Sequence, residues 1–140
     1  MQTKKIKPGA FKHIEAELAD YHLTVKRIKE RRDELLENVS DDENTGGGKS
    51  NIPSRPTEQA ATKLADDLRL QELERIASSI EHVYNLCDDD RKKLIRLKYW
   101  TKPQPLTWEG IAQELLISRR QAFNWRDQIV QAVGERLGWY

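Results

Sequence analysis

The side chains best suited to recognising another molecule lie close together near the C-terminus, between residues 119 and 126. Arginine can pair bidentately with guanine, and glutamine or asparagine can pair with adenine. A phenylalanine in the same segment could touch a thymine methyl, or could equally contact the preceding helix or a partner protein. These types at this spacing predict DNA base contacts by Arg120, Gln121, Phe123 and Asn124.

Hydroxyl and cationic side chains around this segment are suited to binding phosphates. A helix N-terminus offers unpaired amides and a partial positive charge, so a helix that begins here favours an anion. Phosphate contacts set the register of a protein on DNA without reading its sequence. For Lys98 and Lys102 an ordinary solvated position is a comparable explanation. The predicted phosphate contacts are Lys98, Lys102, Thr107, Ser118, Arg119 and Arg126.

The pattern around these residues predicts two short helices joined by a turn. Thr107 and Ser118 stand where each helix needs an N-cap. The spacing makes Trp125 a packing residue rather than one that stacks on DNA. The positions that crossing helices must bury are apolar: Ile111, Leu115, Ile117, Ala122 and Trp125. This is the pattern of a helix-turn-helix, with a purely structural helix pair as the alternative.

The helices on either side of this pair are bounded by acidic residues and prolines. The second helix of the pair is expected to reach about Leu137 despite Gly134. Asp88-Asp89-Asp90 marks a helix start, because acidic side chains face the partial positive charge there. The helix that follows covers residues 91–100, and Pro103 and Pro105 end it.

Residues 57–86 carry a helical apolar pattern, with Thr57 as the expected N-cap. Two stretches of this pattern are slightly out of phase near Leu70, so the segment could be one helix or two helices that meet there. A single long helix is favoured. Cys87 continues the pattern and is expected to be a buried small hydrophobic residue.

The N-terminal part predicts a long helix over residues 11–38, preceded by a loose basic arm over residues 1–10. Apolar residues recur in a heptad pattern, interrupted by Arg32. Such a narrow stripe could join two or more chains, which is favoured, or could lie against residues 57–86 of the same chain. The residues assigned to oligomerisation are Phe11, Ile14, Leu18, Tyr21, Val25, Ile28 and Leu35.

Residues 39–56 are expected to be a flexible linker, because they hold almost no apolar residue. Gly46-Gly47-Gly48-Lys49-Ser50 does not satisfy the phosphate-loop pattern, since Glu43 occupies the first glycine position. No segment alternates as a strand does, so the fold class is all-α. The expected domains are 1–38, 39–56 and 57–140, with the helix-turn-helix at about 88–137.

Composition bounds the remaining possibilities. Charged residues make up 34% of the 140 residues and the formal net charge is +1, so nucleic-acid affinity must come from local patches. One cysteine, Cys87, and three scattered histidines predict neither a disulfide nor a metal site, and no cofactor is expected. We find no catalytic constellation and expect no enzyme. No apolar run suggests a signal peptide or a membrane span, so a cytoplasmic location is expected.

The residues from about Cys87 onward resemble region 4 of bacterial sigma-70-type factors. The matching motifs are Leu94-Ile95-Arg96-Leu97-Lys98-Tyr99 and Thr107-x-Glu109-x-Ile111-Ala112-x-x-Leu115-x-Ile117-Ser118-Arg119. The resemblance implies a helix ahead of the helix-turn-helix and reading of a promoter element in the major groove. This sequence departs from that family at two turn positions. Leu116 stands where glycine is usual, so the turn must avoid left-handed φ or accept strain, and Trp100 replaces another common glycine.

The wider layout is similar to the RinA/ArpU-type transcriptional activators of bacteriophages and prophages. That layout is a long N-terminal helix, a polar linker, and Ser54-x-x-Thr57-Glu58-x-Ala60 opening a helix. The resemblance implies an activator of late packaging and morphogenesis genes that binds double-stranded DNA as an oligomer and acts beside host RNA polymerase. The alternatives are a small terminase subunit that recognises a packaging site and a sigma-mimicking protein that binds polymerase without reading DNA.

Overall fold

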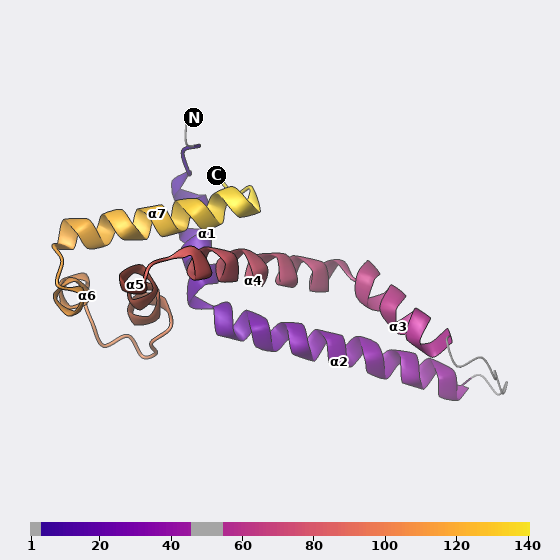
Figure 1. Ribbon diagram of the computed structural model, residues 1–140. Helices are drawn as coiled ribbons and strands as arrows, with labels where there is room; N and C mark the ends of the chain where they lie inside the picture. Colours follow the sequence, from indigo (N-terminus) through magenta and orange to yellow (C-terminus); the bar gives the residue numbers. More distant parts are fainter. Residues whose placement is uncertain (1–3, 46–54) are drawn as a thin grey trace. The chain divides into compact units, whose positions relative to one another are not determined.

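The computed structural model describes residues 4–45 and 55–140, and side chains within 4–38 and 57–140 (Figure 1). The described residues form helices and contain no strand, which confirms the all-α prediction. The helices are α1 (Pro8–Ala19), α2 (Tyr21–Thr45), α3 (Arg55–Asp66), α4 (Leu68–Leu86), α5 (Asp89–Tyr99), α6 (Trp108–Leu115) and α7 (Arg119–Leu137). Within this part of the chain, no helix has the length and apolar character needed to cross a bilayer.

Contacts divide the chain into two compact units. The first unit contains residues 1–22 and 76–140, and the second contains residues 23–75. Both α2 and α4 therefore contribute residues to each unit. These boundaries follow contacts between residues, and the expected domains 1–38, 39–56 and 57–140 stay a prediction.

The expectation of one helix over residues 11–38 is wrong, because the helix breaks at Asp20. Asp20 has φ −91° and ψ 6° and ends α1. The indole N–H of Trp100 donates to the carbonyl of Leu18 at 3.0 Å, and this carbonyl also accepts from a backbone N–H at the end of α1. A tertiary hydrogen bond thus occupies an acceptor at the break. The helix also begins earlier than expected, at Pro8, where proline suits the first turn.

The expected linker over residues 39–56 is largely helical where the structure describes it. Helix α2 continues to Thr45, since no glycine or proline lies between Tyr21 and Gly46. Helix α3 begins at Arg55, so the prediction of Thr57 as an N-cap is wrong. Residues 46–54, which include the glycine-rich segment, lie outside the described residues.

The favoured single helix over residues 57–86 is also wrong, since α3 and α4 meet at Asp67. One oxygen of the Asp67 carboxylate accepts from the amide of Leu70 at 2.8 Å and caps α4. The guanidinium of Arg31 donates to both carboxylate oxygens, at 2.6 and 3.3 Å. Together the guanidinium and the Leu70 amide hold the pKa of Asp67 below its usual range. In the second unit an ion pair thus joins α2 to the junction of α3 and α4.

The core of the first unit collects buried residues from α1, α4, α5, α6 and α7. Gly134 on α7 makes room for α1, since a Cβ there would lie 2.8 Å from Cδ1 of Ile14 and 2.9 Å from Cδ1 of Ile6. The hydroxyl of Tyr99 donates to Glu15 at 2.7 Å and ties α5 to α1. The prediction that Trp125 is a core residue is confirmed, because its side chain is 8% exposed.

Most residues assigned to oligomerisation have packing partners within the chain. Ile14 and Leu18 are buried in the core of the first unit, with Phe11 and Tyr21 partly buried against it. Leu35 is buried and Ile28 is half-buried, whereas Val25 is 41% exposed. Intrachain packing is therefore sufficient to explain the apolar character of α1, and association through the heptad residues stays a prediction.

Trp100 stands where sigma-70 region 4 commonly has a glycine turn, and its side chain packs in an aromatic cluster. Its backbone has φ −109° and ψ 6°, so no left-handed conformation is required. The indole ring stacks on Tyr21 at 5.3 Å and contacts Tyr84 at 4.8 Å, measured between ring centroids. The loop after α5 is therefore fixed by ring packing.

Candidate nucleic-acid interface

Helices α6 and α7 are joined by a tight turn at Leu116 and Ile117. The amide of Ile117 donates to the carbonyl of Ala112 at 3.0 Å, and that of Leu116 donates to Gln113 at 3.1 Å. This pair of bonds forms a Schellman motif, which satisfies the last carbonyls of α6. Leu116 takes the left-handed conformation that the motif needs, with φ 57° and ψ 41°. The turn thus has the usual geometry despite the absence of glycine.

Replacing Leu116 with glycine is expected to raise the free energy of unfolding by roughly 1 kcal/mol, because left-handed strain is relieved at the cost of unfolded-state entropy. Little packing is lost, since Leu116 is 91% exposed. Urea unfolding would measure the gain as a higher midpoint at constant slope. Leu116→Ala is the control, because alanine keeps a Cβ in the strained region. If both variants gain the same free energy of unfolding, the gain comes from removing the leucine side chain and not from relieving backbone strain.

Both predicted N-caps of this pair are confirmed. The hydroxyl of Thr107 accepts from the amide of Gly110 at 3.2 Å, and that of Ser118 accepts from Gln121 at 3.0 Å. Asp88 caps α5 in the same way, accepting from the amide of Arg91 at 2.8 Å. These bonds fix where α6 and α7 begin, and so fix which residues lie in the first turn of α7.

The residues assigned to base contacts share one helix but differ in exposure. Helix α7 buries a face that contains Ala122, Trp125 and Ile129. Arg120 and Asn124 are exposed and one turn apart, while Gln121 is half-buried. The structure therefore places Arg120, Gln121 and Asn124 together on the first two turns of α7.

Phe123 packs mainly against the preceding helix. Its ring lies 5.0 Å from that of Trp108 on α6, between centroids, and the side chain is half-buried. Packing on the preceding helix was one of the two roles considered for this residue. Sequence reasoning did not assign Trp108 any role, although its place next to the Thr107 cap puts it beside the start of α6.

Arg126 lies among aromatic rings. Its guanidinium carbon is 4.9 Å from the Phe123 ring, 5.5 Å from Trp108 and 5.2 Å from Phe11. The side chain is 23% exposed and also pairs with Asp127 at 2.9 Å. These cation–π contacts join α1, α6 and α7. They give Arg126 a structural role beside its predicted phosphate contact.

The other predicted phosphate contacts lie in different surroundings. Arg119 pairs with Glu109 at 3.8 Å, and both side chains are more than half exposed. The ammonium of Lys98 lies 5.1 Å from the ring of Trp108, so this lysine lies beside the start of α6. Lys102 instead pairs with Asp20 at 3.7 Å. Exposed pairs of this kind are weak, and a phosphate can compete for either cation.

The fold and this surface define a small all-α protein. In it, α7 begins at the Ser118 cap, packs against α6 and exposes polar side chains in its first turns. The chain belongs to the DUF722 family, whose model matches residues 11–135 and carries the description "Protein of unknown function (DUF722)". Neither the curated proteins nor the solved structures give a significant match.

Proposed function

We propose that this protein is a sequence-specific DNA-binding transcription regulator, in which α6 and α7 act as a helix-turn-helix. The observation that carries the proposal is the start of α7. There a capped N-terminus is followed by two exposed arginines, Arg119 and Arg120, and by exposed Asn124 one turn on. Backbone N–H groups and arginines at the start of a helix can bind phosphates, and exposed arginine and asparagine side chains can contact base edges. A helix with both features is suited to binding in the major groove of DNA.

The Schellman turn and the two N-caps support this assignment. Main-chain hydrogen bonds fix the turn between α6 and α7, and the hydroxyls of Thr107 and Ser118 fix where each helix begins. A rigid pair keeps the side chains of α7 at constant positions, and constant positions are needed to discriminate bases. The nearby cations Lys98 and Arg119 would contact phosphates and set the register.

The resemblance to sigma-70 region 4 and to RinA/ArpU-type activators supports a more specific role. In this role the protein activates late bacteriophage genes and acts beside host RNA polymerase. In vitro transcription from a late promoter with host polymerase tests this part. Unchanged transcript levels on adding the protein would exclude activation while leaving DNA binding open.

Selection from a random duplex library tests DNA reading directly. Repeated selection with the full chain should enrich one motif, and fluorescence anisotropy should give tighter binding to that motif than to a shuffled duplex. Specific affinity typically exceeds non-specific affinity by about a thousandfold or more. A library that stays random after selection would contradict the proposal. It would favour a protein that binds polymerase without sequence-specific DNA binding.

A further inference from the structure

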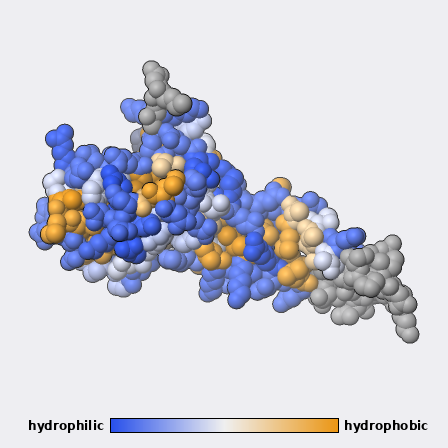
Figure 2. Space-filling model, in the orientation of Figure 1, coloured by the Kyte–Doolittle hydropathy of each residue, from blue (hydrophilic) through white to orange (hydrophobic). Residues whose placement is uncertain are grey.

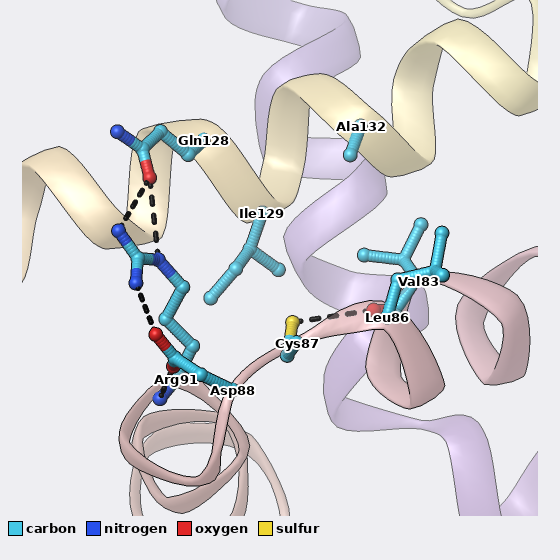
Figure 3. Close-up of a pocket in the computed structure, with 8 residues that line it drawn as sticks. All are labelled: Val83, Leu86, Cys87, Asp88, Arg91, Gln128, Ile129 and Ala132. Carbon is cyan, nitrogen blue, oxygen red and sulfur yellow. Dashed lines mark hydrogen bonds and ion pairs between the residues drawn. The ribbon is translucent and has the colours of Figure 1, made fainter.

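An open groove of about 370 Å³ lies in the first unit where α7 passes the end of α4. Figure 2 shows apolar residues gathered between hydrophilic ones in this region. Three elements line the groove: the end of α4, the start of α5 and the middle of α7 (Figure 3). The lining residues are Val83, Leu86, Cys87, Asp88, Arg91, Gln128, Ile129 and Ala132.

The groove has apolar walls and an adjoining exposed leucine. Val83 and Ile129 are buried beneath it, so its floor is rigid core. Leu86 stands at its edge with 75% of its surface exposed. A groove of this size suits one or two apolar side chains, and the chain itself presents one at the rim.

The polar rim carries one fixed charge of each sign. The guanidinium of Arg91 donates to Oε1 of Gln128 at 3.2 and 3.3 Å, and to the carboxylate of Asp88 at 2.6 Å (Figure 3). It also stacks 4.6 Å from the ring of Trp125. These contacts hold Arg91 and Asp88 in defined positions beside the apolar walls.

The charged pair at the rim of the groove complements itself when its direction is reversed. Of the acidic run Asp88 to Asp90 and the basic run Arg91 to Lys93, Asp88 and Arg91 are the residues that line the groove. A two-fold axis reverses the direction of a segment facing its own copy, so Asp88 of one copy meets Arg91 of the other. The same operation brings the Leu86 of each copy toward the groove of its partner.

We propose that this groove is an interface between two copies of the chain, in which Leu86 of each enters the groove of the other. Charge complementarity selects a second copy, because an acidic or basic partner would match only half of the rim. The inference is independent of DNA binding. It also uses a surface that the heptad residues of α1 and α2 do not include.

Sedimentation velocity on the full chain tests the interface without DNA. The parent protein should associate as its concentration rises, and Leu86→Asp should raise the dimer dissociation constant at least about tenfold by placing a charge in the apolar groove. The matched control is Leu68→Asp, which changes a leucine that is 78% exposed at the other end of α4. The control should associate as the parent does.

A charge exchange provides the second test. Arg91→Glu makes the rim acidic, and Asp88→Asn leaves Arg91 as its one charge and so makes it basic while keeping a capping side chain. Each variant alone should associate more weakly than the parent, and an equimolar mixture should recover association. Circular dichroism would confirm that both variants remain helical.

Three results would overturn the interface. They are a parent that stays monomeric at every concentration, an unchanged dimer in Leu86→Asp, and a mixture that associates no better than its components. Because none of these measurements contains DNA, a failure here is separate from a failure of DNA reading. DNA selection would remain as the independent test of the proposed function.

Discussion

The double variant Arg120→Ala, Asn124→Ala is expected to bind its selected DNA site at least about 30-fold more weakly than the parent. Each bidentate base contact contributes roughly 1–3 kcal/mol of discrimination, so two lost contacts cost about 2 kcal/mol or more. Both side chains are exposed, so the fold should not change. Anisotropy with the selected and shuffled duplexes measures the loss, which should fall mainly on the selected one.

Arg119→Ala is the matched control for this double variant. It removes a neighbouring exposed arginine that is predicted to contact phosphate rather than a base. Binding should weaken about equally for the selected and shuffled duplexes, and the salt dependence should lose about one unit of slope. If the double variant behaves in this uniform way too, base reading by this face of α7 is wrong.

Gly134→Ala is expected to lower the free energy of unfolding by about 1–3 kcal/mol, the usual cost of an overpacked core. A Cβ at this position would lie 2.8 Å from the main-chain oxygen of Trp139 and 2.8 Å from Cδ1 of Ile14. The backbone oxygen cannot rotate away, so α7 or its C-terminal cap must shift. Thermal unfolding should show a decrease in Tm of several degrees.

Gly9→Ala controls for the helix propensity that alanine adds. Gly9 also lies in a helix, but a Cβ there would meet nothing within 4 Å. Its replacement should be neutral or slightly stabilising, because alanine favours helix more than glycine does. Stabilisation by both substitutions would show that α1 can move away from Gly134 at little cost.

The sequence-based predictions succeed where the structure depends on local residues. The caps at Asp88, Thr107 and Ser118 follow from a short polar side chain before an apolar repeat, and all three are present. The burial of Trp125 follows from the helical period alone. Local hydrogen bonding and periodicity carry this information, so it could be read before any contact between helices was known.

The predictions fail where the structure depends on distant partners. The break at Asp20 involves an indole that reaches the carbonyl of Leu18 from residue 100, and the break at Asp67 involves the guanidinium of Arg31. The setting of Arg126 among rings from α1, α6 and α7 likewise needs the tertiary fold. No spacing within one segment could have predicted these contacts.

The positions of the tryptophans give the two units separate optical signals. All four of them, Trp100, Trp108, Trp125 and Trp139, belong to the first unit. Intrinsic fluorescence therefore follows the unfolding of that unit alone, whereas far-ultraviolet dichroism sums the helices of both. The natural chain thus allows the cooperativity between its two units to be measured without an added label.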